Sequence, residues 1–205
     1  QAAKALREMG ALDALERFLT DADPRLRRAA LDGLIDYAYH SSMGKNPIGP
    51  SQYTDGMIKA IAGMLKNPDE AWWVIDGALF AMCNMPADVI QENMESILPW
   101  TTHEEWWLRQ SSFVALTGLA KEDALYRKVL PKLFAMMEAE ENEMSFIYTM
   151  KGHFNKLLKE RKESSQTGKL ILAGLDVCAR NKRIVEGWHG AIDGYNTAML
   201  ITDCL

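Results

Sequence analysis

Apolar residues recur along most of the chain with the spacing of an amphipathic helix. One stripe consists of Met57, Ile58, Ile61, Met64 and Leu65, and residues 125–137 carry a similar one. Intervals of three, four and seven residues place such side chains on one face of an α-helix. No comparable run alternates with a period of two residues. The pattern therefore predicts an all-α protein.

Prolines and capping residues divide these stripes into separate helices. Proline disfavours the helical conformation in the residue before it, and Asp, Asn and Thr cap the helix that follows. Such breakers occur at Asp23-Pro24, within residues 44–50 (GKNPIGP), at Asn67-Pro68, at Pro86 and at Pro99. These signals predict helices near residues 2–9, 12–20, 25–39, 54–66, 69–84, 88–98, 104–121, 124–138, 143–160 and 167–180. The tail that follows them is poorly patterned.

Three of the predicted helices share one local pattern. Aligning LRRAALDGL, WWVIDGAL and LRQSSFVAL superposes Arg27, Trp72 and Arg109, and a leucine follows each of them seven residues later. MKGHFNKLL fits the same frame through Lys151, so the intervals are 45, 37 and 42 residues. These intervals are close to the period of two-helix units, in which stacked helix pairs cover each other's apolar faces.

Residues 3–34 (AKALREMGALDALERFLTDADPRLRRAALDGL) resemble a HEAT repeat, with two antiparallel helices, an Asp-containing turn, and an apolar residue and Arg opening the next helix. The resemblance covers about 160 residues. It implies an armadillo-type, HEAT-like solenoid, an all-α right-handed α-α superhelix of about four helix pairs. We expect residues 1–205 to form a single helical-repeat domain. Because Gln1 begins inside a helix without a polar cap, we also expect the chain to be part of a longer protein.

Two Trp-Trp pairs, each preceded by two acids, are the most distinctive local feature (DEAWW and EEWW). Adjacent residues on a helix point about 100° apart, so the two members of a pair face different surroundings. Trp72 continues an apolar stripe, which predicts that Trp73 lies under a neighbouring helix or on a groove. The same argument separates Trp106 from Trp107. Two interpretations remain open for these rings, packing between repeats and an aromatic binding surface.

Helical repeats of this type specify a fold much better than a function. The leading hypothesis is a non-enzymatic module that binds or scaffolds a protein or peptide partner, with no cofactor. The candidate binding residues are the aromatic side chains Trp73, Trp106, Tyr37 and Tyr39. Large rigid side chains of this kind concentrate binding energy in protein interfaces.

A second, partial resemblance supports an enzymatic alternative. Residues 69–154 are similar to the HEAT-like alkylpurine DNA glycosylases. Trp72 and Asp76 match a Trp followed by Asp four residues later, and Trp107-Leu108-Arg109 looks like a second element of that family. Residues 145–154 (SFIYTMKGHF) are similar to a third, aromatic-rich element, although His occupies the place of its Trp.

This second resemblance implies specific roles for a few side chains. Asp76 would stabilise a cationic, sugar-like transition state or position a water molecule. Trp72 and Trp107 would contact the surroundings of the lesion, and Arg109 would hold a phosphate. The chain departs from the pattern where Arg109 is followed by Gln instead of a second Arg.

The charge distribution weakens the case for a nucleic-acid partner. The formal net charge of -5 is uneven, because residues 69–110 contain eight acids and one base, Arg109. DNA binding depends on neutralising phosphates, so an acidic centre opposes it. Residues 151–183 are instead basic. They are interpreted either as a solvated helix face with acidic partners on the same helix or as a surface for an anionic partner.

Recognised catalytic and metal-binding signatures are missing from the sequence. It has no Gly-x-Ser-x-Gly, phosphate loop, His-Glu-x-x-His or Cys-x-x-Cys motif. Cys83, Cys178 and Cys204 are odd in number and lie mostly in apolar runs, which predicts buried free thiols instead of a disulfide or a metal site. No apolar run reaches 18 residues, so we expect no membrane-spanning helix.

Overall fold

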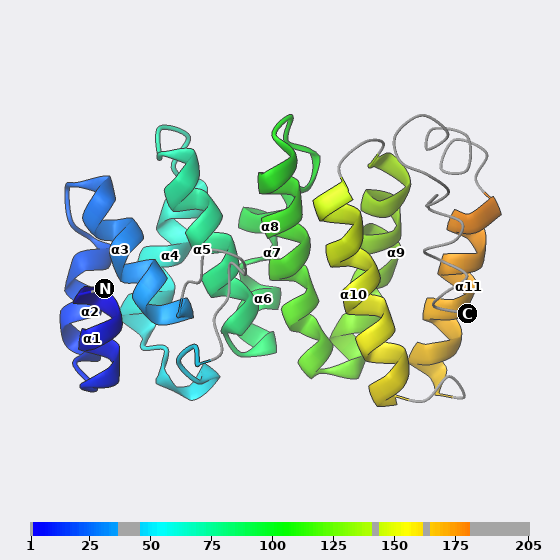
Figure 1. Cartoon of the computed structure of the whole chain (residues 1–205), viewed down its shortest axis with the longest axis horizontal. Coiled ribbons are helices and arrows are strands. Elements are labelled where there is room, and N and C mark those ends of the chain that lie inside the picture. Colours follow the sequence, from blue (N-terminus) through cyan, green and yellow to red (C-terminus); the bar gives the residue numbers. More distant parts are fainter. Residues whose placement is uncertain (1, 37–45, 141–143, 162–164, 181–205) are drawn as a thin grey trace. The chain divides into compact units, whose positions relative to one another are not determined.

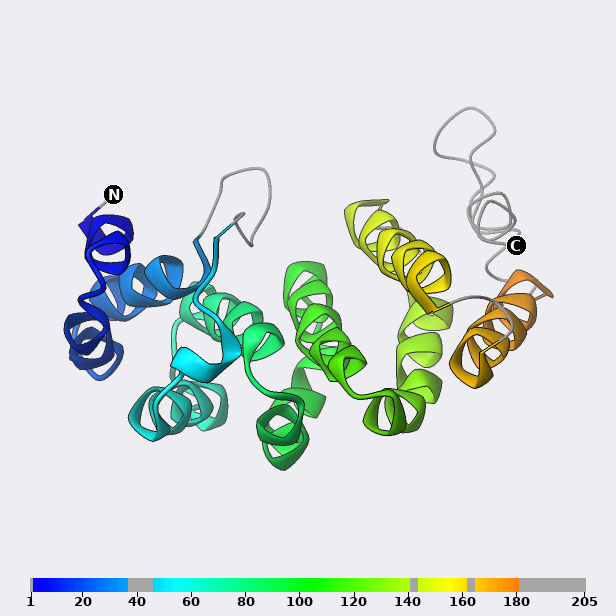
Figure 2. The ribbon, with the colours of Figure 1, turned by 90° about the horizontal axis from the view of Figure 1, so that it is seen from below.

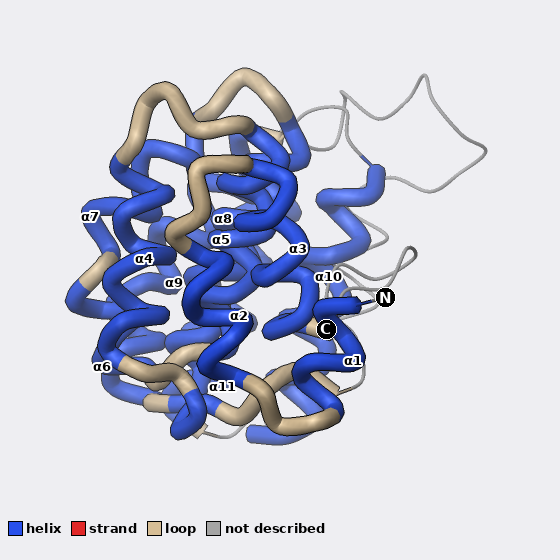
Figure 3. Tube along the Cα trace, turned by 90° about the vertical axis from the view of Figure 1, so that its left-hand side faces the viewer, coloured by secondary structure: helices blue, strands red, loops and turns tan. Residues whose placement is uncertain are grey.

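The computed structural model describes residues 2–36, 46–140, 144–161 and 165–180. Within these ranges the chain forms helices joined by loops, without any strand, as Figures 1 and 3 show. The all-α prediction is confirmed. Contacts divide the chain into two compact units, unit 1 (Gln1–Lys121) and unit 2 (Glu122–Leu205), and each is described by itself. The single-domain expectation stays a prediction.

Unit 1 consists of short helices arranged in two layers (Figure 2). Its elements are α1 (Ala2–Glu8), α2 (Leu12–Leu19), α3 (Pro24–Ile35), η1 (Pro50–Gln52), α4 (Asp55–Lys66), α5 (Trp72–Asn84), α6 (Ala87–Glu92), α7 (Met94–Ile97), η2 (Leu98–Thr102), α8 (Trp106–Thr117) and η3 (Gly118–Lys121). Helices α3, α5 and α8 contact one another in succession, and we call them the α3–α5–α8 layer. Helices α2, α4 and α7 pack against α3, α5 and α8 respectively and form the second layer.

The repeat alignment made from the sequence is confirmed by burial. The aligned residues Leu34, Leu79 and Leu116 are all fully buried between the helices. Ala30 and Ile75, which are also aligned with each other, are each only 1% exposed. Equivalent positions therefore occupy equivalent places in successive helices, as stacking of repeated helix pairs requires.

The predicted breakers set most of the helix boundaries. The Asp23 carboxylate accepts a hydrogen bond from the backbone N–H of Arg25 (2.9 Å) and caps α3. The Thr54 hydroxyl caps α4 in the same way. Helix α3 ends where Asp36 adopts a left-handed conformation (φ 52°), earlier than the predicted residue 39. The predicted helix 88–98 is interrupted at Asn93, whose side-chain amide and backbone N–H both donate to the carbonyl of Val89.

The described residues of unit 2 form three longer helices, α9 (Asp123–Ala139), α10 (Met144–Arg161) and α11 (Gln166–Arg180). The ring of Phe134 on α9 stacks on that of Phe154 on α10, with centroids 5.2 Å apart. At the start of α9, the carboxylate of Asp123 accepts hydrogen bonds from Arg161 of α10 and from the hydroxyl of Thr167 of α11 (2.7 Å). One carboxylate thus links all three helices.

Two cysteines lie in the described part of the chain, and both are free thiols. Cys178 is buried in unit 2, and this burial raises its pKa to about 12. Its thiol is therefore protonated at neutral pH and a poor nucleophile. Cys204 lies outside the described residues. Among the described helices, none is long and apolar enough to cross a membrane.

Candidate functional site

The two Trp-Trp pairs begin neighbouring helices of the α3–α5–α8 layer and meet there. Trp72 of α5 lies with its ring centroid 5.4 Å from that of Trp107 on α8, at an interplanar angle of 55°. Trp107 in turn packs edge-on against Trp106, at 5.8 Å and 80°. We call Trp72, Trp106 and Trp107 the tryptophan cluster. It spans the junction of α5 and α8.

Exposure within the first pair differs from the prediction. Trp72 is 55% exposed, whereas Trp73 is partly buried. The core-facing stripe of α5 begins one turn later, at Val74 and Ile75. A helical side chain covers the turn before its own Cα, so Trp72, as the first residue of α5, extends past the helix end. The solvent-facing ring of this pair is therefore Trp72.

The other predicted binding residues are placed as follows. Trp106 is partly buried and belongs to the tryptophan cluster. Trp73 uses its backbone carbonyl to accept a hydrogen bond from Arg28 of α3. Tyr37 and Tyr39 lie outside the described residues. The binding roles of all four stay predictions.

The indole N–H of Trp107 is buried and lacks a hydrogen-bond partner within the described residues. A buried donor without an acceptor costs about 1–3 kcal/mol. Trp107 therefore carries an unmet polar requirement directly beside the exposed ring of Trp72. A carbonyl that reached this donor would recover part of that cost.

Asp76 lies one turn after Trp72 and joins three helices of the layer. Its carboxylate pairs with the guanidinium of Arg28 on α3 (3.0 Å) and accepts a hydrogen bond from the hydroxyl of Ser111 on α8. The side chains of Arg28 and Asp76 are only 15% and 17% exposed. Arg28 also pairs with Asp32 at 2.6 Å. Asp76 is thus the centre of a part-buried polar network.

Burial and neighbouring charges shift the pKa values of Arg28 and Asp32 in this network. Burial by itself lowers the pKa of Arg28, but the neighbouring carboxylates of Asp32 and Asp76 outweigh it, so the net shift is upward. Burial raises the pKa of Asp32, and Arg28 offsets that rise only in part. Arg28 therefore stays charged and holds the carboxylates of α3 and α5 together.

Arg109 anchors the turn that precedes its own helix. Its guanidinium donates to the backbone carbonyls of His103 (2.8 Å) and Glu104 (2.7 Å). Arg27, the aligned residue of the earlier repeat, donates in the same way to two carbonyls five and six residues before it. Arg109 and Arg27 thus share one structural role. This role explains why an arginine occupies position 109 without invoking phosphate binding.

The remaining residue of the glycosylase-like pattern lies in unit 2. His153 on α10 is partly buried, and its Nε2 lies 2.6 Å from the hydroxyl of Tyr126 on α9. Burial, with a smaller contribution from Lys156, lowers the pKa of His153 to about 3. The imidazole is therefore neutral at physiological pH and packs as part of the unit 2 core.

Carboxylates precede the tryptophan cluster on both of its turns. Asp69, three residues before Trp72, and Glu104, two residues before Trp106, are exposed. Glu70 differs because it is buried against Arg27, at 2.6 Å. The cluster therefore has solvent-facing acids close by in the chain.

Comparison with known proteins gives a fold but no named relative. No family model and no curated protein matches the sequence. Among solved structures, the chain is similar to a designed armadillo repeat protein, YIII(Dq.V1)4CPAF, in complex with peptide (KR)4. The TM-score is 0.59 at 15% sequence identity, and the match covers 98% of this chain and 84% of that chain. The fold is an armadillo- or HEAT-like helical repeat.

In this armadillo-like repeat, the sequence located the aromatic pairs but not their partners. It missed Arg28 and Ser111, which hold Asp76 from the helices on either side. One signal was present, since Asp76 interrupts the apolar run WWVIDGAL and a carboxylate inside such a run needs a polar partner. Which residues supply that partner depends on how α3 and α8 pack against α5.

Proposed function

We propose that this armadillo-like repeat is a non-enzymatic binding module that takes an extended, basic peptide on the α3–α5–α8 layer, centred on Trp72. The observation that carries the proposal is a 55% exposed tryptophan held by ring contact against Trp107 of the next helix. Successive helices of one layer offer a ligand a repeated surface, which suits an extended segment better than a compact molecule.

The geometry of the tryptophan cluster favours binding at low entropic cost. Trp72 leans on Trp107, and Trp107 is braced by Trp106. A ring held in place before binding loses little freedom when a ligand covers it. Tryptophans of this kind dominate the energetics of many interfaces.

Charge favours a basic ligand. A Lys or Arg side chain over an indole gains about 0.5–2 kcal/mol through the cation–π interaction. Asp69 and Glu104, exposed on the turns before the two Trp pairs, add attraction for the same cations. The peptide (KR)4 in the similar designed protein has the corresponding chemistry.

Internal contacts support binding over catalysis. Asp76 is engaged by Arg28 and Ser111, and Arg109 by two backbone carbonyls of its own repeat. A catalytic carboxylate and a phosphate-binding arginine need to face a substrate. These side chains are instead accounted for by contacts that hold the repeat together.

The test is fluorescence anisotropy of a labelled (KR)4 peptide titrated with the whole chain. We expect saturable binding that weakens with added salt and is absent for a peptide with Glu in place of Lys and Arg. Trp72→Ala should raise Kd by about 30-fold, the effect of losing a contact of about 2 kcal/mol. Phe18→Ala on α2 is the matched control, because Phe18 is an exposed aromatic residue (37%) of the second layer of unit 1.

Two results would contradict the proposal. One is equal affinity of Trp72→Ala and wild type for the basic peptide, with both proteins folded by circular dichroism. The other is the absence of saturable binding to any basic peptide at low salt. Either would leave the tryptophan cluster with a packing role only.

A further inference from the structure

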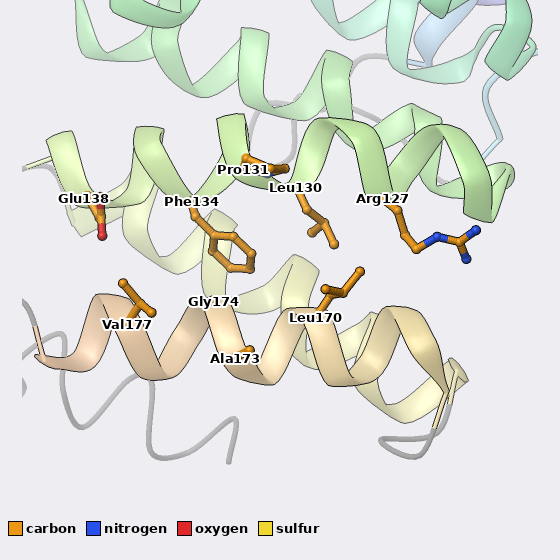
Figure 4. A pocket seen from close by; sticks show the side chains of 9 residues that line it. All are labelled: Arg127, Leu130, Pro131, Phe134, Glu138, Leu170, Ala173, Gly174 and Val177. Atoms are coloured by element: carbon orange, nitrogen blue, oxygen red, sulfur yellow. The ribbon is translucent and has the colours of Figure 1, made fainter.

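Unit 2 has an apolar groove of about 350 Å³ that runs between α9 and α11 (Figure 4). Gly174 of α11 leaves room there for the ring of Phe134, because an added Cβ would overlap that ring. The middle of the groove offers a partner mainly apolar contact. The side chains that line it are Leu130, Pro131 and Phe134 of α9 and Leu170, Ala173 and Val177 of α11.

The side of α11 that lines this groove has the pattern of a helix that packs against other helices. Leu170, Ala173 and Val177 follow one another at intervals of three and four residues, so they share a face. Leu170 and Val177 are nevertheless 42% and 61% exposed. Large apolar side chains gathered at one exposed groove mark an interaction surface, and in a helical repeat such a face is normally covered by neighbouring helices.

Opposite charges lie at the two ends of the groove. Arg127 lies at the Leu170 end, and Glu138 lies at the Val177 end. Along α9, Arg127 precedes Pro131 by as many residues as Glu138 follows Phe134. A complementary occupant must therefore be apolar in its middle and carry the same two charges in reverse order. A copy of this groove, reversed end for end, meets both requirements.

We propose that a second copy of this chain closes the groove, with its α9 and α11 antiparallel to those of the first copy about a two-fold axis. An axis that crosses the groove near Ala173 sets α9 against α9 and α11 against α11, which gives an antiparallel four-helix bundle. Leu170 of each copy then faces Val177 of the other, and Arg127 faces Glu138. A two-fold contact of this kind closes at two copies.

The charges decide the direction of the second copy. In the antiparallel arrangement the two-fold axis generates two pairs of opposite charge, whereas a parallel arrangement would gather both Arg127 side chains at one end and both Glu138 side chains at the other. Asp123 already pairs with Arg127, but it also pairs with Arg161. Because one carboxylate serves two guanidinium groups, Arg127 is only partly neutralised and still attracts Glu138 of the second copy.

The first experiment is sedimentation velocity of the whole chain, without peptide, at loading concentrations from about 1 to 200 µM. A contact made by two helices from each copy belongs with the smaller interfaces, so we expect a reversible monomer–dimer equilibrium and no larger species. Ala173→Arg places a guanidinium group beside the axis in both copies. It should raise the dimer Kd at least about 30-fold, because like charges would meet in the apolar centre.

Ala135→Arg is the matched control for this variant. It makes the same substitution at an exposed position of α9 that does not line the groove. We expect its dimer Kd to equal that of the wild type. A loss of dimer in both variants would mean that added positive charge, and not the groove, controls association, which would overturn the proposal.

Charge reversal tests the antiparallel arrangement itself. Glu138→Arg alone would bring arginines together at both ends of the dimer, and Arg127→Glu alone would bring carboxylates together. Each variant by itself should therefore dimerise at least about tenfold more weakly than the wild type. In a one-to-one mixture, with one variant labelled, opposite charges meet again at both ends, so the mixed dimer should form with nearly the wild-type Kd. A role confined to one copy cannot produce this recovery.

Three outcomes would overturn the proposal. A wild type that stays monomeric over the whole concentration range would show that a different partner covers the groove. A dimer that survives Ala173→Arg would place the contact elsewhere on the chain. Two folded charge variants that fail to associate when mixed would exclude the antiparallel arrangement. Circular dichroism verifies folding, and the comparison of Ala173→Arg with Ala135→Arg decides the proposal if Arg127→Glu is unfolded. The result is independent of peptide binding, because the tryptophan cluster belongs to unit 1.

Discussion

The polar network around Asp76 leads to a quantitative prediction about unit 1. Asp76→Ala removes the ion pair to Arg28 (3.0 Å) and the hydrogen bond from Ser111. Hydrogen bonds to a charged partner contribute about 1.5–3 kcal/mol each. Both partners keep other contacts, however, because Arg28 still pairs with Asp32 (2.6 Å) and Ser111 still donates to the carbonyl of Trp107 (2.8 Å). We therefore expect a loss of about 2 kcal/mol in unfolding free energy, below the sum of the two bonds.

Asp76→Asn should cost less than Asp76→Ala. The amide oxygen still accepts from Ser111, while the charge opposite Arg28 is lost, so we expect about 1 kcal/mol. Asp69→Asn is the control. Asp69 is an exposed acid of the preceding turn, and surface substitutions of this kind change stability by about 0.5 kcal/mol or less.

Urea unfolding followed by tryptophan fluorescence measures this difference. Five of the six tryptophans lie between residues 72 and 107, so the signal reports mainly on unit 1. A midpoint for Asp76→Ala equal to that of Asp69→Asn would refute the bridging role. Loss of methylated-purine excision in Asp76→Asn without a loss of stability would instead support the glycosylase-like alternative.

Three further predictions concern other parts of the chain. Because burial lowers the pKa of His153 to about 3 from its usual 6.5, the unfolded chain binds a proton that the folded chain does not. Unit 2 should lose stability as the pH falls from about 6.5 toward 3. His153→Gln should flatten that dependence in circular-dichroism melts at several pH values, and an unchanged slope would contradict the assignment. Gly118→Ala should cost about 2 kcal/mol or more in urea titrations, because the new Cβ would lie 2.5 Å from the Cys83 carbonyl oxygen. Gly63→Ala, with open space around it, should instead be neutral or stabilising. The protein should not bind a labelled DNA duplex with an abasic-site analogue tightly at low salt. Arg109→Ala should lower its thermal stability. Tight DNA binding that Arg109→Ala abolishes would contradict both expectations.

Helix positions followed from the sequence because they depend on local chemistry. The Asp23-Pro24 and Thr54 caps, and the burial of Leu34 and its aligned leucines, required no knowledge of distant residues. Where prediction and structure differ, the cause is a local choice between alternatives. Asn93 donates to the carbonyl of Val89 from its side chain as well as from its backbone, and the helix that the apolar pattern would continue ends there.

The candidate site was only partly accessible from the sequence. Helical periodicity shows that two adjacent tryptophan side chains point in different directions. It predicts which of them is exposed only where a preceding helical turn lies beneath the first side chain. Trp72 is exposed because α5 begins with it and no turn precedes it. The contact between Trp72 and Trp107 joins residues 35 positions apart, and no local rule specifies it.

The sequence by itself determined the all-α class, the repeat frame and most of the helix boundaries, since these depend on periodicity and capping within a few residues. Tertiary structure alone decided which tryptophan faces solvent, that Asp76 meets Arg28 and Ser111, and that α9 and α11 leave an apolar groove. These features depend on how helices far apart in the chain pack against one another. A single helix carries its own apolar face in its sequence, but its partner on that face is set by the folded stack.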